Sequence, residues 1–135
     1  MKKICYGLFI LFSLAFTADN TLKDGIYSGI SRSIYLDEPY YGCTKLTIEN
    51  GRIVQVNFII RDSSKHENFD SKYERYFAGN EHYIEQCRKD WKGAVAYPDS
   101  LIKYQDLNKV DAISGATWAY NMFKASAEIA LEKAR

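Results

Sequence analysis

The segment TKLTIENGRIVQVNFII, residues 44–60, most constrains what this chain can fold into. At its centre stands Asn50-Gly51, a dipeptide favoured in type I′ turns because both central residues of such a turn have positive φ. Strand-like runs flank the turn, and in the second run four apolar residues alternate with Gln55 and Asn57: Val54, Val56, Phe58 and Ile60. Alternation with a period of two gives a strand one apolar face. We therefore predict a β-hairpin whose second strand turns these four residues toward the core.

Other segments extend this hairpin into a small domain. DGIYSGIS, residues 24–31, predicts a turn followed by a short strand, and LDEPYYG, residues 36–42, predicts a loop before the hairpin. Behind the hairpin, RDSSKHEN and the overlapping KHENFDSKYER are rich in charged residues, so we predict a solvated face from residue 61 to 75.

Three helical patterns follow in the second half of the chain. Ser71 and Glu74 have the spacing of a capping box, and apolar residues then recur at helical steps as far as Trp91, with a kink or break predicted at Gly79-Asn80. Pro98 predicts the start of a second, short helix. The last helix, residues 117–134, places one group of side chains on a single side: Trp118, Met122, Phe123, Ser126, Ile129 and Ala130.

These elements predict one α+β domain with a small antiparallel or mixed sheet. The sheet contains the hairpin and is packed by helices, among them the C-terminal amphipathic helix. A chain of 135 residues without repeats or a low-complexity linker favours a single domain.

The first 18 residues have the pattern of a signal peptide. Lys2 and Lys3 precede ICYGLFILFSLAF, an apolar run too short to span a bilayer, and small residues allow cleavage after Ala15, Thr17 or Ala18. We predict a signal peptide over 1–18, a mature domain over 19–135, and export to the periplasm or another extracytoplasmic space. An uncleaved membrane anchor is the alternative.

Charge and cysteine content restrict the partners of such an exported domain. Removing Lys2 and Lys3 from 18 basic residues leaves 16 against 17 acidic ones, and no Lys/Arg stripe is present, which argues against a nucleic-acid partner. Cleavage also removes Cys5. The remaining Cys43 and Cys87 either pair in an oxidising compartment or stay as free thiols.

Common catalytic and metal-binding motifs are absent from the sequence. There is no P-loop, GxGxxG, CxxC or HExxH, and the two histidines, His66 and His82, each lie alone in a charged stretch. We predict no metal site and no catalytic residue.

The segment DAISGAT, residues 111–117, carries more polar groups than a helix start requires. Asp111, Ser114 and Thr117 surround Gly115 and Ala116, whose small side chains leave the backbone accessible. The first-turn N–H groups of a helix lack partners and its dipole is positive there, so the segment is either a plain cap or a phosphate site.

DAISGAT also resembles the flavinylation motif D-x-x-[S/T]-G-A-T of the FMN-binding domain family. The resemblance extends to DGIYSG, LTIENGRIVQVNF and WAYNMFKASAEIAL, and so covers most of the chain from Asp24 onward. That family includes the periplasmic flavin subunits of sodium-pumping NADH:quinone reductase and of Rnf complexes, as well as small exported domains.

The resemblance implies a cofactor and the residues that hold it. In the family a separate Mg-dependent flavin transferase uses FAD to attach FMN to the last threonine of the motif through a phosphoester. Here this implies Thr117 as the acceptor, Asp111 as the acidic residue that the transferase recognises, and Ser114, Gly115 and Ala116 as the phosphate cradle. Where many family members have further Ser/Thr residues, this chain has Trp118, Ala119 and Tyr120, aromatic rings that either cover the flavin or pack in the core.

The resulting interpretation is an exported flavoprotein that transfers electrons between a donor and an acceptor. Components of a membrane respiratory chain are candidates for these two partners. No pair of side chains in the sequence is arranged for general acid–base work, so we expect a carrier rather than an enzyme with its own substrate. The alternatives are a flavin-dependent enzyme acting on a small molecule, and a non-redox binding module.

Overall fold

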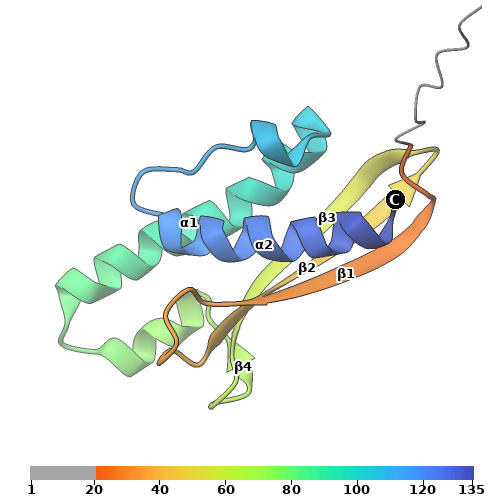
Figure 1. The fold of residues 1–135 in the computed structure, drawn as a ribbon. Helices are drawn as coiled ribbons and strands as arrows, with labels where there is room; N and C mark the ends of the chain where they lie inside the picture. The colour runs from red at the N-terminus through yellow and green to blue at the C-terminus, as the bar shows by residue number, and fades with distance from the viewer. Residues whose placement is uncertain (1–20) are drawn as a thin grey trace, which may run out of the picture.

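In the computed structural model, which describes residues 21–135, a four-stranded antiparallel sheet carries the helices on one of its faces (Figure 1). The strands follow chain order across the sheet: β1 (Gly25–Arg32), β2 (Tyr40–Glu49), β3 (Arg52–Asp62) and β4 (Glu67–Asn68). The helices are the 3-10 helix η1 (Ser71–Phe77), α1 (Glu81–Tyr104), the 3-10 helix η2 (Leu107–Lys109) and α2 (Thr117–Lys133). The predicted α+β class is therefore confirmed. The predicted signal peptide, residues 1–18, lies outside the described residues.

Helix α2 lies across β1 and β2, and α1 lies beside it over β3 (Figure 1). The two ends of the described chain meet at one edge, where the N–H of Lys23 donates to the carbonyl of Ala134 at 2.7 Å. This arrangement places the core between the sheet and the two long helices.

The predicted hairpin is present, with β2 pairing β3 around Asn50 (φ 52°) and Gly51 (φ 70°). The carboxylate of Asp24 accepts hydrogen bonds from the N–H groups of both turn residues, at 3.0 Å and 2.9 Å. The predicted loop over 36–42 is too long, because β2 already begins at Tyr40.

Of the four residues predicted to face inward from the second strand of the hairpin, Val54 does not. A register shift between Thr47 and Ile48 inserts an extra residue into β3, so Ile53 is buried whereas Val54 is 44% exposed. A bulge of this kind reverses the alternation on one side of it. Beyond the bulge Val56, Phe58 and Ile60 are buried as predicted.

The helix predicted from Ser71 is split as expected. Asp70, rather than Ser71, caps η1, and after Gly79 (φ 91°) Asn80 caps α1 by accepting from the N–H of Tyr83. The predicted second helix starting at Pro98 does not exist, because α1 runs through Pro98 without interruption. Tyr97, Pro98 and Leu101 are all buried there, and this packing offsets the backbone hydrogen bond that proline cannot make.

The last helix has the predicted extent but a slightly different buried face. Ile129 is 36% exposed and Trp118 is only half-buried, whereas the fully buried positions are held mostly by small residues: Ala119, Met122, Phe123, Ser126, Ala127 and Ala130. Small side chains let α2 approach the sheet closely. A Cβ on Gly29 of β1 would lie 2.0 Å from the carbonyl oxygen of Ser126.

The solvated face predicted over residues 61–75 is partly wrong. Asp62, Phe69 and Tyr73 are buried, and the Tyr73 hydroxyl donates to the Asp62 carboxylate at 2.5 Å. Burial acts to raise the pKa of Asp62, but hydrogen bonds from Ser64, Tyr73 and the Lys65 N–H outweigh it and lower that pKa to about 2. This charged residue therefore belongs to the core rather than to the solvated surface.

The two remaining cysteines are free thiols in this structure. Cys43 is half-buried on β2 and Cys87 is buried on α1. Between residues 21 and 135 no helix combines the length and the apolar character that crossing a membrane requires.

Candidate functional site

The segment from Ser114 to Thr117 forms a tight turn that leads directly into α2. Gly115 has a φ of 82°, in the left-handed region that favours glycine, and Ala116 is the N-cap residue. An alanine side chain cannot accept a hydrogen bond, and the side chains of Asp111, Ser114 and Thr117 do not cap the helix either. All three are exposed. Plain capping by the motif's own side chains is thereby excluded.

The cap comes instead from the neighbouring helix. Asp90 of α1, only 5% exposed, accepts a hydrogen bond from the N–H of Ala119 at its Oδ1, 3.2 Å away. Gln86 Nε2 donates both to Asp90 Oδ2, at 3.2 Å, and to the carbonyl of Gly115, at 2.8 Å. Burial raises the pKa of Asp90, while these hydrogen bonds act to lower it.

Tyr97, two turns further along α1, holds the other side of the turn. Its hydroxyl donates to the carbonyl of Ala116 at 2.9 Å and accepts from the N–H of Ile113 at 3.1 Å. Between Asp90 and Tyr97, Gly93 lets the two segments touch, since a Cβ there would lie 2.5 Å from that of Ala116. One face of α1 therefore fixes the backbone of the motif.

Lys89 covers the turn from outside. Glycine is needed at 115 for its φ, whereas a Cβ there would meet only the Cδ of Lys89, 2.8 Å away, which a flexible lysine side chain can move. The aliphatic part of the Lys89 side chain lies beside Gly115, which is two residues before Thr117 in the chain.

Thr117 is the first residue of α2 and is exposed. Within residues 21–135 its hydroxyl makes no hydrogen bond, and no acceptor faces the N–H groups of Thr117 and Trp118. An open hydroxyl beside two free N–H groups at the positive end of a helix fits a phosphate group. The residues present therefore suit a phosphate-bearing cofactor such as FMN.

The aromatic residues after Thr117 belong mostly to the protein interior. Trp118 Nε1 donates to Glu38 Oε2 at 2.9 Å, and its ring lies edge-on to those of Tyr40 and Phe69. Tyr120 donates its hydroxyl to the carbonyl of Val110 at 2.8 Å. Of the two roles left open for these rings, packing is the one this geometry supports.

The predicted site residues differ in how close they come together. Ser114, Gly115, Ala116 and Thr117 form one turn, whereas Asp111 lies before it, exposed and without a hydrogen bond in the described part of the chain. Their roles toward FMN stay predictions.

Sequence reasoning missed the support from α1. The only signal was Asp90 itself, an acid placed next to Trp91 in a stretch of helix that also buries Cys87. His66 and His82 are exposed, and residues 21–135 contain no group of three or more His, Cys, Asp or Glu side chains that would hold a metal.

Comparison with known proteins agrees with this geometry. The profile of the FMN-binding domain matches residues 43–132, which include most of the β2–β3 hairpin, α1, the Ser114–Thr117 turn and nearly all of α2. A crystal structure of a protein from Clostridium perfringens has a similar fold, with a TM-score of 0.61 and 23% sequence identity over 84% of this chain and 88% of the other. No curated protein sequence matches the chain.

Proposed function

Because this chain belongs to the FMN-binding domain family, we propose that it is an exported flavoprotein that carries FMN covalently on Thr117 and transfers electrons between two partners. The observation that carries the proposal is the state of Thr117. Its hydroxyl is exposed, and among residues 21–135 it makes no hydrogen bond and stands beside two N–H groups that have no acceptor.

Attachment requires an outside catalyst, because nothing in the turn activates the hydroxyl. A threonine hydroxyl is a weak nucleophile without an adjacent base. Asp90 is the carboxylate that contacts the helix start, but Oδ1 is occupied by Ala119 and Oδ2 by Gln86. A flavin transferase would therefore supply the base and take up the hydroxyl proton, while Thr117 Oγ1 would bond to the FMN phosphorus of FAD as its pyrophosphate bond breaks and AMP leaves.

The chain's own contribution is to present and hold the attachment point. Gln86, Asp90 and Tyr97 fix the backbone around Thr117, and the free N–H groups at the start of α2 bind the phosphate. When bound, a flavin supplies reversible one- and two-electron chemistry. A covalent tether suits an exported protein, because a dissociating cofactor would be lost by dilution outside the cytoplasm.

Co-expression with a flavin transferase tests the attachment. We expect flavin fluorescence that survives denaturing electrophoresis and an intact mass increased by one FMN less one water. Thr117→Ala abolishes both signals, and Thr117→Ser, which keeps a hydroxyl, is the matched control that retains them. Covalent flavin in Thr117→Ala would refute Thr117 as the acceptor.

Export and the carrier role have their own tests. N-terminal sequencing of native protein should find a mature start between Phe16 and Asp19, whereas a start at Met1 would refute cleavage.

Stopped-flow reduction and reoxidation of the flavin-loaded protein should show reversible cycling with artificial donors and acceptors. Saturable turnover of one small metabolite, abolished by replacing a side chain outside the motif, would favour an enzyme instead.

A further inference from the structure

The outer edge of β3, on the side away from β2, lies beside α1. At its C-terminal end the edge is closed by the chain itself. β4 pairs with Arg61 and Asp62, and the N–H of Phe69 then donates to the carbonyl of Ile60 at 2.7 Å.

The N-terminal end of the same edge is closed by a side chain. Gln105, the left-handed C-cap of α1, donates from Nε2 to the carbonyl of Ile53 at 2.8 Å and accepts from the N–H of Ile53 at its Oε1, 2.9 Å away. Its amide group occupies the place of a neighbouring strand. The outward-pointing main-chain groups of β3 are therefore hydrogen-bonded within the chain at Ile53 and at Ile60.

Between these two points the edge is open. The N–H and C=O of one residue point to the same side of a strand, and successive residues alternate. Since the carbonyl of Ile60 points toward β4, the main-chain groups of Phe58 and Val56 point the same way. Within residues 21–135 nothing pairs with them.

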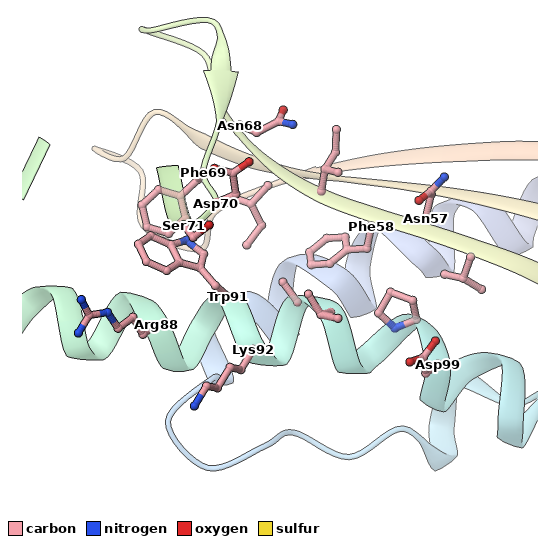
Figure 2. Close-up of a pocket in the computed structure, with 16 residues that line it drawn as sticks. Asn57, Phe58, Asn68, Phe69, Asp70, Ser71, Arg88, Trp91, Lys92 and Asp99 are labelled. Atoms are coloured by element: carbon pink, nitrogen blue, oxygen red, sulfur yellow. The ribbon is translucent and has the colours of Figure 1, made fainter. Parts of the chain in front are cut away.

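An apolar groove of about 830 Å³ runs between this open edge and α1 (Figure 2). Figure 2 shows Phe58 pointing from β3 toward α1 and Trp91 pointing from α1 toward Phe69. Val95, on the same side of α1, is 72% exposed, which is high for a valine beside a core. Trp91 also leaves its Nε1 buried without a partner among the described residues.

We propose that an extended, apolar segment of a partner protein binds in this groove as an added strand, antiparallel to β3 and in line with β4. The open main-chain groups select a polypeptide, because only another backbone presents donors and acceptors at the matching spacing. Residues of the segment opposite Val56 and Phe58 turn their side chains toward α1, where Val95 and Trp91 meet them.

The charges around the groove favour a segment without net charge. Arg88 is paired with Glu74, and Asp70 accepts the N–H of Lys72 as the cap of η1, so that Lys92 and Asp99 are the cation and the anion without a partner among the described groove residues. They stand seven residues apart, about 10 Å along the helix. The segment is therefore apolar at alternate positions and uncharged between its ends.

The groove and the helix start lie on different sides of α1. Asp90, Gly93 and Tyr97 face the Ser114–Thr117 turn, whereas Trp91 and Val95 line the groove. A bound segment therefore leaves Thr117 open. The proposal does not depend on flavin attachment and is testable in the Thr117→Ala variant as well.

The probe is the blocked peptide acetyl-Glu-Val-Thr-Val-Thr-Val-Lys-amide, which has no net charge, added to the native protein and followed by two-dimensional amide NMR. We expect the Val56 and Phe58 amides to shift and their hydrogen exchange to slow about tenfold or more at saturation. The valines that turn their side chains into the groove lie opposite Val56 and Phe58. In an antiparallel pair these same valines exchange main-chain hydrogen bonds with β3, whereas the N–H groups of the threonines point away from it. N-methylation of the valines should abolish the effect, whereas N-methylation of the threonines should leave it intact.

A protein variant supplies the second arm. Val95→Lys puts a charge into the groove at an exposed position, so it should leave the melting temperature unchanged and weaken peptide binding at least about tenfold. Binding that survives both valine methylation and Val95→Lys would overturn the proposal, as would no binding at millimolar peptide. Protection of Val56 and Phe58 that rises with protein concentration in the absence of peptide would assign the edge to a second copy of the chain and also overturn it.

Discussion

The carboxylate of Asp90 accepts a hydrogen bond from the backbone N–H of Ala119, 3.2 Å away, so a residue of α1 caps the helix that carries Thr117. The cap residue of α2 itself, Ala116, has no side-chain acceptor. The start of α2 is therefore stabilised by a contact between residues 29 positions apart in the chain.

Replacing Asp90 should lower the stability of the protein, by more when the hydrogen bond to the Ala119 N–H is lost than when it is kept. Asp90→Leu removes the acceptor and lowers the free energy of unfolding by about 1–2 kcal/mol, while Asp90→Asn keeps an oxygen for Ala119 and loses less. Urea denaturation measures both. Asp99→Asn, on the groove side of α1, is the control that should change little, and equal stability of Asp90→Leu and wild type would contradict the cap.

The bulge in β3 predicts opposite outcomes for two neighbouring valines. Val56→Asp buries an unpaired charge and should cost about 3 kcal/mol or more, whereas Val54→Asp, at a position 44% exposed, should cost less than about 1 kcal/mol. Urea titration of the two variants compares them directly. A larger loss for Val54→Asp would mean that the register of β3 is wrong.

The close approach of β1 and α2 predicts that Gly29 tolerates no side chain. The added Cβ of Gly29→Ala would meet the carbonyl oxygen of Ser126 at 2.0 Å and the nitrogen of Ala130 at 2.8 Å, both backbone atoms that cannot move aside alone. We expect a loss of about 1–3 kcal/mol or more in unfolding free energy. Ser28→Ala, on the adjacent exposed position, serves as the control, and a stable Gly29→Ala would show that α2 packs further from the sheet.

Asp62 should make stability depend on pH in the acid range. Its pKa in the folded protein is about 2, below the ordinary value of 3.8, so the folded state favours the ionised form. This contribution, about 2 kcal/mol, is present above the ordinary pKa and is lost as the pH falls toward the folded value. In Asp62→Asn the stability should fall less between about pH 5 and pH 2. Parallel pH profiles for wild type and variant, from urea unfolding, would contradict the assignment.

Much of the architecture was predictable because its signals are local. The Asn50-Gly51 turn and the alternation at Val56, Phe58 and Ile60 identify the hairpin from residues that neighbour each other in sequence. The helical period over residues 117–133 and the break at Gly79 are local in the same sense. The position of the Ser114–Thr117 segment at the start of the last helix followed from these patterns.

Two of the failed predictions involve a choice between two structures that local signals permit equally. A proline at 98 is compatible with a helix start or a helix interior, and the burial of Tyr97 and Leu101 decides for the interior. A charged segment around Asp62 is compatible with solvent or with a buried hydrogen-bonded acid, and Tyr73 decides for the latter.

The sequence by itself determined the first strand, the hairpin, the last helix and the segment that presents Thr117, since turn chemistry and hydrophobic period act over a few residues. Only the tertiary structure decided how the start of α2 is capped and where β3 stays open. The cap joins Asp90 to Ala119, and the edge is closed at one end by Gln105 on Ile53. Such contacts join residues 29 and 52 positions apart, and they form only when packing against the sheet brings the helices into place.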